Sequence, residues 1–229
     1  MLGVFVNVLT VIVGSLVGLL FKKGIPEKVS KAAMIGLGVC TVYIGISGSL
    51  EGENVLIIIA AVVLGAIVGT LMNIDGAVNR LAEKVEEKFR RGGEKGSLAE
   101  GFVSATLLFC VGSMTVTGSI QAGLTGDNSI LITKAMLDLV SSMMLASSLG
   151  AGVLLASGSV LVIQGGLVLL AGLLAPFMDA GAVREMTCAG SLLIIMIGTN
   201  LMGISKFKVA DYLPAVLFAP VIYHIISLF

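Results

Sequence analysis

Apolar runs of about twenty residues alternate with short polar segments along most of the chain. A helix that crosses a bilayer needs roughly 20 apolar residues, because each residue advances it about 1.5 Å through a hydrocarbon core about 30 Å thick. The pattern predicts an all-α, polytopic membrane bundle of about eight spans. The expected spans are 3–21, 30–49, 54–73, 100–124, 130–155, 159–177, 187–204 and 210–228.

Composition agrees with a lipid environment. Apolar residues make up 57% of the 229-residue chain and charged residues 12%, and the mean hydropathy is +1.09. Soluble domains carry roughly 25% charged residues, which cover their surface. The formal net charge of zero gives no electrostatic reason to expect a nucleic-acid partner. We expect the lipid bilayer as the main partner and no separate soluble domain.

The positions of the basic residues predict an orientation. Lys and Arg follow the first, third and seventh spans, and of the 14 basic residues only Lys134 and Arg184 lie elsewhere. With eight spans these three loops share one side, and cytoplasmic loops are the ones rich in Lys and Arg. We therefore expect a multi-pass inner (plasma) membrane protein with both termini outside the cytoplasm. The N-terminal apolar run precedes its positive charges, which favours a first span over a signal peptide.

The longest loop follows the third span. Within 76–91, Val78, Leu81, Val85 and Phe89 recur at spacings of three and four. This spacing predicts an amphipathic helix, either lying on the cytoplasmic membrane surface or simply connecting two spans.

Two pairs of segments suggest an internal repeat. GSLVGLL at 14–20 resembles VLLAGLL at 168–174, and YIGISG at 43–48 resembles MIGTNLMG at 196–203. Spans one to three would then match spans six to eight in inverted orientation, a common construction in secondary transporters. Chance similarity between Gly-rich apolar segments stays open. The chain divides into a first three-helix repeat (1–75), a cytoplasmic helix and loop (76–98), a central polar hairpin (99–156) and a second three-helix repeat (157–229).

The central hairpin is the most polar part of the predicted membrane region. Its first helix carries Ser113, Thr115, Thr117, Ser119 and Gln121 among several glycines. Glycine weakens a helix, and freed backbone groups are tolerated in hydrocarbon only where they face protein or a watery cavity. An interrupted helix here would offer backbone groups to a solute. Close helix packing through small residues is the alternative.

Asp138 is the sharpest feature of the second hairpin helix. It lies about 12 Å into the predicted span, near the middle of the bilayer core, where a charged carboxylate costs at least about 2.5 kcal/mol. Lys134 at i−4 could pair with it, whereas Ser141 and Ser142 share its face and would suit a small cation or polar solute. A structural ion pair and a solute- or ion-binding site both stay open.

Three amides lie in other spans. Asn200 lies between two glycines in the seventh span and is a candidate binding residue. For Asn7 and Gln164, interhelical hydrogen bonds are the expected role.

The remaining chemistry is sparse. Cys40, Cys110 and Cys188 all fall in apolar segments, and an odd number of thiols is not a disulfide framework. His224 is the only histidine, so we expect no metal site and no cofactor. Without a Ser/His/Asp set, an HExxH motif or paired intramembrane aspartates, we do not expect an enzyme.

Three segments carry a family resemblance. GVFVNVLTVIVGSLVGLLFKKGIPE at the start, CVGSMTVTGSIQAGL in the middle and GTNLMGISKFKVADYLPA near the end resemble the YqgA/YdfK-like family. This resemblance implies an uncharacterised bacterial inner-membrane protein of unknown function, a group loosely described as transporters. It implies no particular substrate or site residue.

We expect a secondary transporter of a small polar or charged solute, coupled to H⁺ or Na⁺, with its site in the central hairpin. Two alternatives remain: an oligomeric channel or pore, and a membrane protein that serves assembly or lipid interaction without transport. A homodimer is the expected oligomer.

Overall fold

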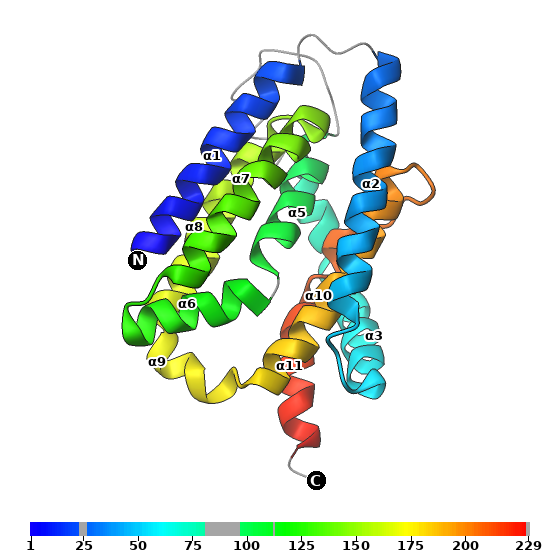
Figure 1. Cartoon of the computed structure of the whole chain (residues 1–229). Coiled ribbons are helices and arrows are strands. Elements are labelled where there is room, and N and C mark those ends of the chain that lie inside the picture. The colour runs from blue at the N-terminus through cyan, green and yellow to red at the C-terminus, as the bar shows by residue number, and fades with distance from the viewer. Residues whose placement is uncertain (23–26, 81–96, 112, 228–229) are drawn as a thin grey trace.

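The computed structural model describes residues 1–22, 27–80, 97–111 and 113–227. These residues form a bundle of helices, and no strand occurs among them (Figure 1). Residues 81–91 of the predicted amphipathic helix (76–91) lie outside the described part. The helices are α1 (Leu2–Lys22), α2 (Glu27–Ser49), α3 (Val55–Met72), α5 (Ser97–Cys110), α6 (Ser113–Thr125), α7 (Ser129–Leu149), α8 (Gly152–Leu169), α9 (Ala171–Leu174), α10 (Ala180–Leu201) and α11 (Pro214–Ile226), with 3-10 turns η1 (Ala175–Phe177) and η2 (Val209–Tyr212).

The lengths of the helices confirm an all-α membrane bundle. Among the described residues, α1, α3, α7, α8, α10 and η2 with α11 give six helices long and apolar enough to cross a membrane. The pair α5 and α6 bends by 58° at its break and makes a seventh if it is one span. The 23-residue α2 would be an eighth, and the predicted count of eight stays a prediction.

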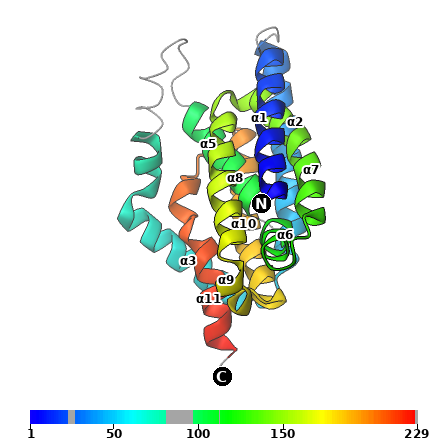
Figure 2. The same cartoon turned by 90° about the vertical axis from the view of Figure 1, so that its left-hand side faces the viewer.

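Helices far apart in the sequence pack in pairs. α1 packs against α7 and α8, α2 against α10, α3 against α11, and α5 against α8; Figures 1 and 2 show α3 beside α11 from two directions. α1 and α7 run parallel, since Gly3 lies against Leu131 near their starts and Gly18 against Met143 nearer their ends. The pairs α2–α10 and α3–α11 run antiparallel. These directions agree with a chain that reverses at each crossing.

Glycines allow α1 to lie directly on α7. A Cβ atom at Gly14 would clash with Ser142 Oγ and the Leu139 carbonyl oxygen, and one at Gly18 would clash with the Met143 carbonyl oxygen. Glycines spaced by four residues let helix backbones approach closely, which favours association in lipid. The close approach carries polar groups of α1 to the face of α7.

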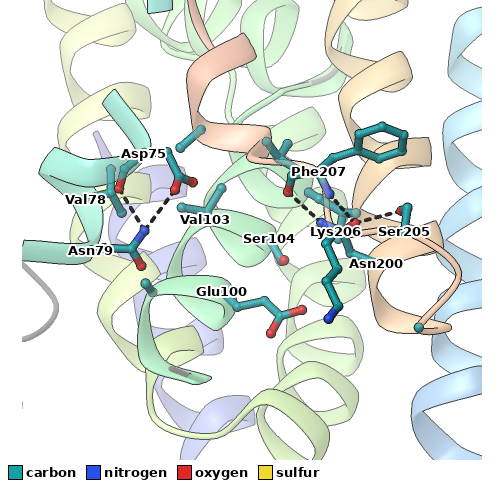
Figure 3. A pocket seen from close by; sticks show the side chains of 15 residues that line it. Asp75, Val78, Asn79, Glu100, Val103, Ser104, Asn200, Ser205, Lys206 and Phe207 are labelled. Carbon is teal, nitrogen blue, oxygen red and sulfur yellow. Dashed lines mark hydrogen bonds between the residues drawn. The ribbon is translucent and has the colours of Figure 1, made fainter. Parts of the chain in front are cut away.

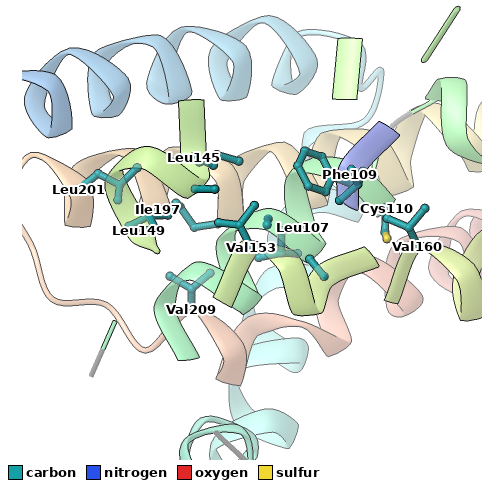
Figure 4. Packing of buried hydrophobic residues seen from close by; sticks show 14 of the residues in the cluster. Leu107, Phe109, Cys110, Leu145, Leu149, Val153, Val160, Ile197, Leu201 and Val209 are labelled. Carbon is teal, nitrogen blue, oxygen red and sulfur yellow. The ribbon is translucent and has the colours of Figure 1, made fainter. Parts of the chain in front are cut away.

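The main apolar core lies where α5, α7, α8 and α10 meet (Figure 4). Phe109 of α5, Leu145 of α7, Val153 of α8 and Leu193 of α10 are all buried in it. This core fixes α5 against the helices that flank the central hairpin.

The bounds of α8 and α10 differ from the predicted spans, and α8 ends at Leu169 although the predicted sixth span continues to 177. The turn between α7 and α8 lies at Gly150, whose φ of 83° ends the helix, and not between residues 155 and 159. Small residues at 156–159 continue α8, where the Ser157 hydroxyl donates to the Leu154 carbonyl oxygen at 2.7 Å. α10 begins at Ala180 and not near 187, because the Asp179 side chain caps its first turn.

Candidate functional site

A buried ion pair joins two residues one turn apart on α7. Lys134 Nζ lies 2.6 Å from Asp138 Oδ2, and the side chains are only 8% and 7% exposed. Asp138 lies about 14 Å along α7 from its first residue, near the middle of a bilayer core. Pairing removes the net charge that hydrocarbon would penalise.

Two amides from other helices complete the group. Asn7 of α1 donates through Nδ2 to Asp138 Oδ2 at 3.0 Å and to Gln164 Oε1 of α8 at 3.2 Å. Both amide side chains are fully buried. We call Asn7, Lys134, Asp138 and Gln164 the charged cluster.

The orientation of both amides follows from the carboxylate. Because Asp138 accepts, Asn7 must present its NH₂ group, and Gln164 must then present its carbonyl oxygen to Asn7. Gln164 Nε2 is left buried without a hydrogen-bond partner among the described residues. Buried donors in proteins are nearly always paired, so this amide remains available to a further hydrogen-bond acceptor.

The break between α5 and α6 adjoins the charged cluster. Cys110, the last residue of α5, lies close enough to Lys134 and Asp138 for both charges to act on its thiol. The Thr115 hydroxyl of α6 bridges the break by donating to the Phe109 carbonyl oxygen at 3.0 Å.

The polar residues predicted in the first hairpin helix do not gather on one face. Thr115 and Ser119 are buried, and Ser119 Oγ has no partner among the described residues. Thr117 is exposed, and Gln121 donates to Asp127 Oδ2 at 2.7 Å in the turn before α7. Ser113 begins α6, and its side chain lies outside the described part.

The other predicted residues lie around the cluster or apart from it. Ser142 is buried one turn beyond Asp138, but its hydroxyl donates to the Leu139 carbonyl oxygen at 3.0 Å. Ser141 is half-buried beside it. Asn200 lies at the far end of α10, where its Oδ1 accepts from the Phe207 amide at 2.8 Å. A binding role for these residues stays a prediction.

Three residues are more prominent in the structure than their sequence pattern predicts. Asn7 and Gln164 make the interhelical hydrogen bonds predicted for them, and these bonds bring both residues into the cluster around Asp138. Glu185 is 2% exposed, and its Oε1 accepts from the backbone amides of Glu53 at 2.9 Å and Asn54 at 3.0 Å. The predicted seventh span begins at 187 and therefore leaves Glu185 outside it.

Lys134 supplies the cation that the Asp138 carboxylate holds. Asp138 accepts two hydrogen bonds, one from an amide and one from an ammonium whose flexible stem can move. A proton or metal cation at Asp138 would compete with Lys134. Among the described residues no group of three His, Cys, Asp or Glu side chains is placed to hold a metal ion by itself.

Comparison with known proteins identifies the family. A family model described as "Protein of unknown function (DUF554)" matches residues 2–224. The chain belongs to this family. It is 32% identical over 233 residues to the uncharacterized membrane protein YdfK of Bacillus subtilis (strain 168), covering 100% of this chain and 98% of YdfK.

A second relative lies in another bacterium. The uncharacterized protein YqgA of Escherichia coli (strain K12) is 31% identical over 221 residues, covering 95% of this chain and 94% of YqgA. Both matches confirm the resemblance drawn from the three sequence segments. No solved structure matches the chain.

Proposed function

We propose that this DUF554 protein is a secondary transporter of a small polar or charged solute, coupled to H⁺ or Na⁺. The charged cluster carries the proposal. Ionisable residues inside a membrane are expensive and usually belong to a solute or ion pathway. A cluster kept only for packing would not need a lysine, a carboxylate and a donor left unpaired.

The ion pair supplies a mechanism for coupling. A cation that binds Asp138 must displace the Lys134 ammonium, which lies 2.6 Å from it. The freed ammonium then favours an anionic or acceptor group of the solute, next to the open amide of Gln164. Binding of ion and solute would therefore depend on one another through the same carboxylate.

The broken span supports the same reading. Transporter sites commonly lie at the ends of discontinuous helices, where backbone groups without helical partners line the site. Here the end of α5 at Cys110 lies beside the charged cluster, and α6 continues after a 58° bend.

An inverted repeat of α1–α3 and α8–α11 forms part of the proposal, and the crossing of α2 and α10 supports it. A Cβ atom at Gly45 would lie 2.8 Å from the Ser191 carbonyl oxygen, and one at Gly198 would lie 2.8 Å from the Gly38 carbonyl oxygen. Gly45 and Gly198 are as far apart in the sequence as Gly38 and Ser191, so these two residues of α2 have their repeat counterparts in α10. The two helices thus cross at matching residues, as a two-fold relation requires.

The crossing of α1 and α8 agrees with the same repeat. The same sequence separation makes Val160 the counterpart of Asn7, and Gln164 the counterpart of Val11. Asn7 bonds Gln164 at 3.2 Å, while Val11 and Val160 are fully buried in one core cluster. Inverted repeats of this kind allow a site near the midplane to open to either side of the membrane.

The proposed orientation places the loop 202–208 and the segment after α3 in the cytoplasm, with both termini outside. The concentration of Lys and Arg in these loops supports it.

Reconstitution tests the proposal. The purified protein is placed in liposomes under a pH or Na⁺ gradient with a defined mixture of amino acids, organic acids, sugars and nucleosides, and uptake is read by mass spectrometry. Saturable uptake of one class that collapses with the gradient is expected. Single-channel currents would make it a pore, and no uptake would favour a role in assembly or lipid interaction.

A further inference from the structure

A cavity of about 370 Å³ lies at the end of the bundle that carries the basic loop 202–208 (Figure 3). Its walls come from four parts of the chain: the segment after α3, the first turns of α5, the end of α10, and the loop with η2. Its volume falls within the range of small-molecule sites, which is roughly 300–1,000 Å³. The charged cluster does not line it.

Two opposite charges face this cavity without an ion-pair partner among the described residues. Glu100 projects from the first turn of α5, and Lys206 projects from the loop after α10. Figure 3 shows their charged ends directed toward one another across the space. A third charged side chain, Asp75, also lines the cavity, and its carboxylate accepts a hydrogen bond from the Asn79 side chain at 3.0 Å.

The remaining wall combines apolar and neutral polar groups. Val78, Val103 and Phe207 supply apolar contacts, and Ser104, which is buried, supplies a hydroxyl. Asn200 is held by Phe207 and Ser205, so its position is fixed before any ligand enters. A small ligand with one charge of each sign and a short body fits such a site.

We propose that this cavity binds a small zwitterion, with its ammonium group at Glu100 and its carboxylate at Lys206. Glu100 and Lys206 are both exposed to solvent, so a simple cation or anion would pair with one of them and leave the other to water. Only a ligand with both charges satisfies both walls through charge-assisted hydrogen bonds.

The position of the cavity connects this ligand to the charged cluster. α5 runs from Glu100 in the cavity wall to Cys110 beside Lys134 and Asp138, about 15 Å along one helix. The role of the zwitterion as transported solute rests on the proposed function, whereas its binding does not.

The test measures binding to the full-length protein in detergent by isothermal titration calorimetry. The probes are glycine, L-alanine, L-glutamine and 4-aminobutyrate, each with its methyl ester, which lacks the carboxylate, and its N-acetyl form, which lacks the ammonium. Saturable binding of at least one intact zwitterion is expected, with at least about ten-fold weaker binding of both derivatives.

Two variants and a control assign the charges. Glu100→Gln and Lys206→Gln should each weaken zwitterion binding by at least about ten-fold. Lys206→Gln should not change the binding of the methyl ester, which is already weak because the ester lacks the carboxylate. Glu53→Gln, at an exposed position outside the cavity wall, should change nothing.

Either of two results would overturn the proposal: no probe binds the wild-type protein, or binding is indifferent to both variants. Both are separable from failure of the transporter proposal. Flux without zwitterion binding would discard the ligand class alone, and zwitterion binding without flux would retain the site and discard transport.

Discussion

Replacing Lys134 by methionine should destabilise the protein strongly, because the Asp138 carboxylate would remain buried without its cation. Unit charges 2.6 Å apart attract by about 6 kcal/mol at an effective dielectric constant of about 20. Desolvation offsets much of this attraction, and breaking a buried pair from one side costs about 3–5 kcal/mol. Alternatively, the lone carboxylate could take up a proton. At pH 7 this protonation costs about 4 kcal/mol, given the ordinary pKa of aspartate. Both routes predict a loss of about 3–5 kcal/mol.

Thermal unfolding in detergent measures this loss. The chain has no tryptophan, but a thiol-reactive fluorescent dye reports unfolding through Cys110 and Cys188, which are buried. At about 2–4 °C per kcal/mol for a chain of this size, Tm should fall by on the order of 10 °C.

A neutral double variant and an exposed pair provide the controls. Lys134→Met combined with Asp138→Asn should recover most of the lost Tm, because no lone charge remains. Arg184→Gln removes an ion pair to Glu53 whose side chains are 39% and 68% exposed, and should cost less than about 1 kcal/mol. A Lys134→Met protein as stable as the wild type, or no more stable after Asp138 is also neutralised, would refute the reasoning.

Three further predictions concern positions outside the charged cluster. Gly14→Ala should lower the free energy of unfolding by about 1–3 kcal/mol, because the added methyl group forces α1 away from α7. In the control Gly158→Ala the methyl group meets no atom within 4 Å, so Tm should stay unchanged or rise slightly. Equal effects of the two substitutions would contradict the close approach of α1 and α7. Glu185→Ala should cost about 1–3 kcal/mol by leaving two backbone amides without an acceptor, and Glu185→Gln, which keeps an oxygen, should cost less in the same assay. Burial and the neighbouring Asp211 carboxylate raise the pKa of Asp75, so its folded form holds a proton at a higher pH than its unfolded form. The difference in Tm between the wild type and Asp75→Asn should therefore change in favour of the wild type as the pH falls through that raised pKa. Profiles of Tm against pH that run parallel for the two proteins would refute this prediction.

The hydrophobic pattern predicted the class of fold well because burial in lipid depends mainly on local composition. It could not place every helix end. The small residues at 156–159 look the same in a loop as in a helix that packs closely, and only the positive φ of Gly150 decides where the turn lies. Likewise the Asp179 cap sets the start of α10 well before its most apolar part.

The candidate site was predictable only where its partners are close in sequence. Lys134 and Asp138 lie one turn apart on the same helix, so their pairing is visible from spacing alone. Asn7 and Gln164 reach Asp138 only because α1 packs against both α7 and α8. Such contacts between distant helices depend on tertiary packing, which spacing in the sequence does not encode.

Flux through proteoliposomes with Asp138 altered tests the central claim most directly. Uptake of the solute found for the wild-type protein is compared among the wild type, Asp138→Asn, the double variant Lys134→Met/Asp138→Asn, and Glu53→Gln as a control at an exposed carboxylate. We predict that both variants lacking the Asp138 carboxylate lose gradient-driven uptake, while Glu53→Gln retains it and the double variant stays folded and monodisperse. Undiminished uptake by the folded double variant would contradict the account.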